Sequence, residues 1–257
     1  MKTKLVTLCS AVLLSSLVHG QDLINFNAVT DTPTTFTGGT GIYRAVELGV
    51  ENDTLSYNGF NVTVGSGTGA AASLAGQSFL ALCINLRYES PAAGQDYTYS
   101  TDSSLLSYNP DGNGDFWDDN ASGKYTAISN MVAQMSPILV GLDQSQAEFQ
   151  EWMVAMSFAL SEIIADYNGS VNSLNLEDGR NQFYYQNDVS IDGAVYAKYQ
   201  QAIGYIGTAA PEGFVLQTAS INNTTNQDVI LIPVPEPSVI SLAGILGAFG
   251  LLRRRRL

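Results

Sequence analysis

The stretch SQAEFQEWMVAMSFALSEIIADYNG, residues 145–169, decides most about the fold. Its apolar residues recur every three or four positions, the spacing of one face of an α-helix. The stripe consists of Phe149, Trp152, Met153, Met156, Leu160, Ile163, Ile164 and Tyr167. Ser145 with Glu148 has the form of a capping box, and Asn168-Gly169 is a typical helix stop. The stretch therefore predicts one long helix with an apolar face.

The residues before this helix favour β-structure. Asn58-Gly59 suits a type I′ hairpin turn because both residues tolerate positive φ. Apolar residues flank this pair with the alternation of strands: Leu55, Tyr57, Phe60, Val62 and Val64. Further strands are expected at 36–50 and 78–86, and a weaker helix at 124–139. The first half therefore predicts a sheet that is followed by helices.

Beyond Gly169 the pattern indicates a helix at 191–206 and strands at 214–218 and 229–232. No Pro/Ser-rich linker or long run of charge divides the region between 21 and 233. Its length suits one hydrophobic core. We therefore expect a single α+β domain, rich in strands and with a central helical segment.

The N-terminus has the pattern of a secretory signal peptide. Lys2 and Lys4 precede an apolar run over residues 5–18, and small Gly20 follows. Cleavage after Gly20 leaves Gln21 as the first residue of the exported chain. A buried first helix is the alternative interpretation of the same run.

Signal-peptide removal takes away His19, the only histidine, and Cys9, one of two cysteines. Cys83 is then the single thiol, so an internal disulfide is excluded. Histidine-based acid/base catalysis, a Ser-His-Asp triad and ordinary Cys/His zinc sites are excluded as well. A hydrolase that uses two carboxylates remains open.

The chain is strongly acidic, with a formal net charge of -13. Few basic residues lie between the signal peptide and the terminal arginines: Arg44, Arg87, Lys124, Arg180 and Lys198. Nucleic-acid binding needs clustered Lys and Arg side chains. We therefore expect no nucleic-acid partner.

The C-terminal tail reads PVPEPSVISLAGILGAFGLLRRRRL over residues 233–257. The motif Val234, Pro235, Glu236, Pro237 and Ser238 is extended, since prolines stop helices and sheets. The apolar segment 239–252 is shorter than the roughly 20 residues that span a bilayer comfortably. The basic stop Arg253, Arg254, Arg255 and Arg256 stays cytoplasmic by the positive-inside rule.

This tail, residues 234–257, closely resembles the PEP-CTERM sorting signal of Gram-negative bacterial surface proteins. The resemblance implies export by the secretion machinery and an intermediate tethered to the inner membrane. An exosortase then cuts near the Pro-Glu-Pro motif and releases the protein to the cell surface or extracellular matrix. An ordinary C-terminal membrane anchor is the alternative.

The stretch FLALCIN, residues 79–85, with Pro91, Gly94 and Tyr97 after it, resembles the thioester, or TQXA-type, domains of bacterial surface adhesins. In that family a strand cysteine is joined to the glutamine of a Thr-Gln-x-Ala motif on a later helix. Residues 156–159 read Met-Ser-Phe-Ala, so Ser157 stands where the glutamine belongs. Serine has no carboxamide to acylate Cys83. The resemblance thus implies a thioester-like remnant, and the apolar neighbours of Cys83 favour a buried, unreactive thiol.

The loop NPDGNGDFWDDN, residues 109–120, is a candidate calcium site. Asp111, Asn113 and Asp115 alternate as oxygen ligands do in calcium loops, and Asp118 or Asp119 completes the shell. Phe116 and Ser122 depart from the EF-hand pattern. A plain acidic, turn-rich loop is the alternative, and no other cofactor is expected.

Carboxylate pairs occur throughout so acidic a chain. Glu162 and Asp166 share a helix face, and we interpret both as exposed, which makes a poor acid/base couple. The sequence favours a non-enzymatic surface or matrix protein whose partner is an extracellular polysaccharide or a surface protein. Two alternatives stay open: a calcium-assisted or degenerate thioester-type adhesin, and an exported carboxylate-dependent glycoside hydrolase.

Overall fold

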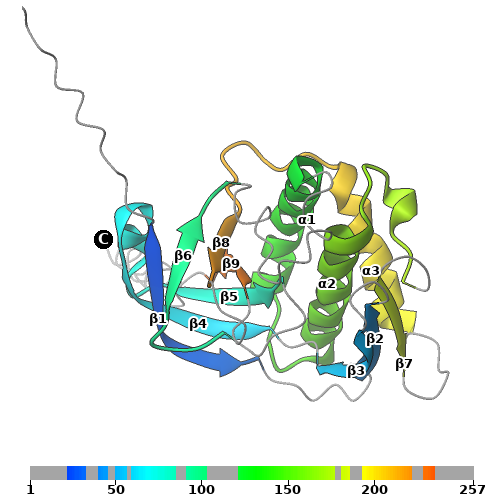
Figure 1. Ribbon diagram of the computed structural model, residues 1–257, viewed down its shortest axis with the longest axis horizontal. Coiled ribbons are helices and arrows are strands. Elements are labelled where there is room, and N and C mark those ends of the chain that lie inside the picture. Colours follow the sequence, from blue (N-terminus) through cyan, green and yellow to red (C-terminus); the bar gives the residue numbers. More distant parts are fainter. Residues whose placement is uncertain are drawn as a thin grey trace, which may run out of the picture.

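The computed structural model describes residues 22–32, 40–45, 50–56, 59–84, 91–102, 121–176, 181–185, 193–221 and 228–234. Backbone alone is described for the strands within 40–56 and 181–185. The described part combines an antiparallel barrel, a layer of helices and a small second sheet (Figure 1). The expected α+β class is confirmed.

Six antiparallel strands form a closed barrel. In barrel order they are β1 (Leu23–Asp31), β4 (Phe60–Gly67), β5 (Ser78–Cys83), β9 (Val229–Pro233), β8 (Gln217–Ser220) and β6 (Asp96–Ser100). Closure leaves no unpaired strand edge in the barrel. Its core includes Phe26, Val62, Phe79, Tyr97 and Leu231.

The helices cover one flank of the barrel (Figure 1). They are α1 (Ala121–Gly141), α2 (Ala147–Asp166) and α3 (Gly193–Gly204), the last continued by the 3₁₀ turn η5 (Tyr205–Gly207). Leu80 and Leu82 of β5 join the core of this layer, whereas Phe79 and Ala81 join the barrel core. The alternation of side chains along one strand thus connects the two cores.

The second sheet has the order β3-β2-β7 and is antiparallel. It consists of β2 (Thr40–Ala45), β3 (Val50–Ser56) and β7 (Asn181–Tyr185). β7 packs against α2. This sheet lies at the helical end of the molecule, away from β6 (Figure 1).

The predicted long helix is confirmed as α2, which ends at Asp166 before Gly169 with φ 104°. The capping box is wrong. Gln146 is the N-cap residue, and its side chain makes no capping hydrogen bond. The Ser145 hydroxyl instead donates to Asp143 Oδ1 at 2.8 Å, as does the Ser145 backbone N–H at 2.9 Å. A turn that begins at Asp143 therefore replaces the capping box, because the Asp143 carboxylate accepts both hydrogen bonds that Ser145 donates.

The expected strands near 36–50, 78–86, 214–218 and 229–232 and the helices near 124–139 and 191–206 all have counterparts in the structure. The hairpin across Asn58-Gly59 is wrong, because β3 and β4 belong to different sheets. β4 pairs with β1 on one edge and with β5 on the other. Both edges of β4 are thus occupied, and β3 pairs with β2.

Residues 1–21 and 235–257 lie outside the described residues, together with the predicted signal peptide, the apolar segment 239–252 and the terminal arginines. Among the helices that the structure does describe, none is long and apolar enough to cross a membrane. Val234 is the last described residue, and its backbone N–H donates to the Ser78 carbonyl at 3.2 Å.

Candidate functional site

Cys83 ends strand β5 and packs against the barrel core, with intermediate exposure. Its desolvation, together with the negative charge of Asp228, raises the pKa of the thiol far above its ordinary value. The thiolate is the nucleophilic form of cysteine. Cys83 is therefore a protonated and weakly nucleophilic thiol at neutral pH.

Asp228 is held in place at the start of β9. Its Oδ1 accepts a hydrogen bond from the Ile221 backbone N–H at 2.8 Å, and its carbonyl accepts one from Ile84 N–H at 2.9 Å. Burial raises the pKa of Asp228 to about 6, against the lowering effect of the Ile221 hydrogen bond. At neutral pH this carboxylate is ionised and suppresses thiolate formation at Cys83.

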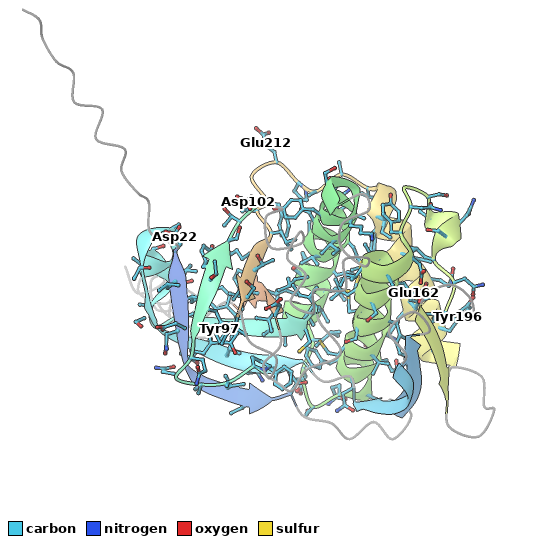
Figure 2. The ribbon with its side chains drawn as sticks, viewed as in Figure 1. Asp22, Tyr97, Asp102, Glu162, Tyr196 and Glu212 are labelled. Atoms are coloured by element: carbon cyan, nitrogen blue, oxygen red, sulfur yellow. The ribbon has the colours of Figure 1, made fainter. Side chains whose placement is uncertain are left out.

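Tyr97 of β6 completes this group of titratable side chains. It is fully buried, stacks at 4.9 Å between ring centroids on Phe26, and its hydroxyl accepts from Ala92 N–H at 2.9 Å. Desolvation is the main cause that raises the pKa of Tyr97, and Asp228 and Cys83 add to it. Figure 2 shows Tyr97 inside the barrel. Neither Tyr97 nor Asp228 is a cation that would stabilise the thiolate, and the negative charge of Asp228 disfavours it.

Ser157, the other residue of the thioester-like remnant, lies on α2 and is buried. Its hydroxyl donates to the Met153 carbonyl at 2.9 Å, one turn earlier. The apolar side chains of α2 belong to the helical core, while Cys83 packs on the barrel core. The Ser157 hydroxyl is therefore engaged within α2.

Glu162 of α2 is fully buried, and so the interpretation of Glu162 as an exposed carboxylate is wrong. Burial raises the pKa of the Glu162 carboxyl to about 9, and the negative charge of Asp166 adds to this rise. The Asn175 backbone N–H faces the carboxyl and partly opposes this rise. Within the described residues neither carboxyl oxygen has a hydrogen bond of ordinary geometry. Glu162 is therefore a neutral carboxylic acid at pH 7.

Tyr199 of α3 is a second buried titratable residue, and it interacts electrostatically with Glu162, which Figure 2 labels. Its side chain is buried, and its hydroxyl has no hydrogen-bond partner among the described residues. Desolvation raises the pKa of Tyr199, and Glu162, Tyr196 and Asp166 add to that effect. One feature of the sequence is consistent with the burial of Glu162, since it is the only charged residue between Trp152 and Ala165.

The remaining predicted site residues lie outside the described residues. These are the calcium candidates Asp111, Asn113, Asp115 and Asp119, and the sorting residues 235–238 and 253–256. No cluster of three or more His, Cys, Asp or Glu side chains with metal-site geometry occurs in the described ranges. Calcium binding by residues 109–120 stays a prediction.

No family model matches the chain, and no curated protein matches it. Solved structures do match. The N-terminal thioester domain of the fibronectin-binding protein SfbI from Streptococcus pyogenes is 13% identical, with 82% of this chain and 92% of that chain covered and a TM-score of 0.43. The N-terminal domain of the Streptococcus pyogenes pilus tip adhesin Cpa is 10% identical, with coverages of 80% and 100% and a TM-score of 0.40.

A third match is the N-terminal thioester domain of a surface protein from Clostridium perfringens. It is 14% identical over 75% of this chain and 97% of that chain, with a TM-score of 0.34. These proteins are of the class that the sequence around Cys83 resembles. At such low identities and TM-scores we transfer no residue role and no ligand from them.

Proposed function

We propose that this chain is an exported surface or extracellular-matrix protein with a non-catalytic binding or structural role. The secretion machinery exports the protein, and residues 239–252 tether it to the membrane. An exosortase then cuts near residues 235–238 and releases the protein to the cell surface or matrix. The partner class is an extracellular polysaccharide or another surface protein. The tail and the signal-peptide pattern of the sequence support this delivery.

The observation that carries the proposal is the position of β9, the last strand among the described residues. β9 lies between β5 and β8, and its residues 229–232 are buried. The described domain extends to Val234, immediately before the Pro-Glu-Pro motif. A cut C-terminal to Val234 therefore leaves every barrel strand intact, as a removable sorting tail requires.

The chemistry of the described residues supports a non-catalytic role. The Cys83 thiol stays protonated at neutral pH, and the Ser157 hydroxyl donates its hydrogen bond to the Met153 carbonyl of the same helix. Glu162 has the raised pKa of a general acid, but no part of its side chain reaches the surface. A glycoside hydrolase needs its acid in contact with the sugar. A hydrolase centred on Glu162 is therefore disfavoured.

The test compares intact masses of the protein from the membrane fraction and from the culture fluid. The released form should begin at Gln21 and lack residues 253–256. Replacing Pro235, Glu236 and Pro237 together by alanine should retain the protein in the membrane fraction. The matched control is Pro211→Ala/Glu212→Ala, a Pro-Glu pair on an exposed turn of the folded domain. Release of a full-length C-terminus contradicts the proposal.

A further inference from the structure

Leu23, where β1 begins, and Val234, which follows β9, are both hydrogen-bonded to the same connection of the barrel. The Leu23 N–H donates to Thr68 Oγ1 at 2.9 Å, and the Thr68 N–H donates to the Leu23 carbonyl at 2.8 Å. The Val234 N–H donates to the Ser78 carbonyl at 3.2 Å. Thr68 and Ser78 bracket the short helix η2 (Gly69–Leu74), which joins β4 to β5. We call residues 65–78, with Leu23 and Val234, the terminal rim.

The apolar segment begins only five residues after Val234. An extended chain of five residues reaches about 17 Å. A domain of about 200 residues has a radius of gyration of about 16 Å and is therefore more than twice as wide as this tether is long. A domain held by such a tether cannot turn a distant face toward the bilayer.

The terminal rim has an unusual composition for this chain. Residues 65–78 read GSGTGAAASLAGQS and carry no charged side chain, although the net charge of the chain is -13. Most of them are exposed, including Ala70, Ala72, Ser73 and Gln77. One carboxylate, that of Asp22, packs closely over Gly69. Anionic headgroups repel carboxylates, so a rim with only the Asp22 carboxylate beside it approaches a lipid surface at a smaller electrostatic cost than the acidic remainder of the chain.

The opposite end of the molecule carries α3 and the β3-β2-β7 sheet (Figure 1). Figure 2 labels Asp22 and Tyr196 at opposite ends, and Tyr196 is 47% exposed. We infer that the terminal rim is the surface that faces the lipid bilayer in the tethered precursor. The end with α3 and the second sheet then points outward, where a surface partner meets it. This inference rests on the proposed function.

The experiment uses the precursor 21–257 with Cys83→Ala, reconstituted in vesicles of phosphatidylethanolamine and phosphatidylglycerol. A donor fluorophore is placed on Ala72→Cys at the terminal rim or on Tyr196→Cys at the outer end. The acceptor is a headgroup-labelled lipid. Energy transfer should be larger from position 72 than from position 196. Ser73→Cys is a second rim position if Ala72→Cys alters the thermal melt.

A flexible insert provides the matched control. About 20 Gly and Ser residues between Val234 and Pro235 lengthen the root-mean-square reach by about 25 Å. The difference between positions 72 and 196 should then be lost or strongly reduced, because the domain tumbles on the longer tether. Equal transfer in the uninserted precursor, or more transfer from position 196, overturns the orientation and leaves sorting intact. A precursor that does not bind the vesicles overturns the proposed function as well.

Discussion

The Glu162 carboxyl on α2 lies near enough to the Tyr199 hydroxyl on α3 for its charge to raise the pKa of that phenol. Both side chains are buried, and among the described residues neither polar group has a hydrogen bond of ordinary geometry, although the Asn175 backbone N–H faces the Glu162 carboxyl. Burying an ionised carboxylate in such surroundings is unfavourable, so the folded protein keeps Glu162 protonated. Burial of Glu162 on α2 is therefore coupled to the binding of one proton.

This proton makes the free energy of unfolding depend on pH. Glu162 titrates at about 9 in the folded protein and near its ordinary 4.5 when unfolded. Between these values the folded state binds the extra proton, so stability decreases as pH rises. We expect the melting temperature to decrease from pH 6.5 to pH 9. Starting at pH 6.5 avoids most of the titration of Asp228, whose pKa is about 6.

Glu162→Gln should flatten this pH dependence and, at pH 8, stabilise the protein by several kcal/mol, because pH 8 lies about 3.5 units above the unfolded pKa and below the folded one. Glutamine keeps the shape of the neutral acid and cannot ionise. Glu148→Gln, on the exposed first turn of the same helix, is the control and should leave the slope unchanged. Thermal melts at several pH values measure both. A wild-type slope that persists in Glu162→Gln would show that other groups cause it.

Cys83 should form no thioester. A thioester needs an acyl donor, and serine occupies position 157, where its hydroxyl bonds to the Met153 carbonyl. The intact mass of the folded protein should therefore equal the sequence mass, without the loss of one ammonia, and an added amine should not react. A missing ammonia together with an amine adduct would mean that a glutamine elsewhere supplies the acyl group.

The thiol should also react slowly with a maleimide until the protein unfolds, because burial and Asp228 both keep it protonated. Asp228→Asn removes the charge and keeps an acceptor for the Ile221 N–H, so labelling of Cys83 should become faster. Cys83→Ser should lower stability by about 1 kcal/mol or more by burying a hydroxyl. If Asp228→Asn leaves the labelling rate unchanged, burial alone protects the thiol.

Local patterns predicted most elements of the fold but not their partners. The apolar stripe from Phe149 to Ile164 predicts α2 because helical periodicity is a property of the segment itself. α1, α3 and β7 all contact this helix, and these tertiary contacts are not contained in its own sequence pattern. The sequence pattern therefore indicates an exposed Glu162, although tertiary packing encloses it.

The hairpin across Asn58-Gly59 fails for the same reason. The Asn-Gly pair that indicates a turn is a local feature, whereas β4 pairs with β1 and β5, and these pairings are set by the whole sheet. Asp228 likewise gains its raised pKa from burial in the folded protein, and the Ile221 N–H that partly opposes the rise lies seven residues earlier in the sequence. Residue identity predicts an unactivated thiol at Cys83, but the carboxylate that helps to suppress it is visible only in the structure.

Asn61 of β4 and Gln144, before α2, exchange two hydrogen bonds between the barrel and the helical layer. Asn61 Nδ2 donates to Gln144 Oε1 at 2.8 Å, and Gln144 Nε2 donates to Asn61 Oδ1 at 3.0 Å. Asn61→Ala and Gln144→Ala should each destabilise the protein by about 1 kcal/mol. The double mutant should cost less than the sum, with a coupling energy of about 0.5 kcal/mol or more. Strict additivity in urea unfolding would contradict the pair.

The loop at residues 109–120 should bind calcium if Asp111, Asn113 and Asp115 act as ligands. A cation that binds only the folded state raises its stability by mass action. Excess calcium should therefore raise the melting temperature of the wild type and not that of Asp111→Ala/Asp115→Ala. Asp143→Ala is the matched control, since Asp143 also leads an acidic turn, and its carboxylate is occupied by Ser145. Equal calcium responses in wild type and the double mutant would identify the loop as ordinary acidic surface.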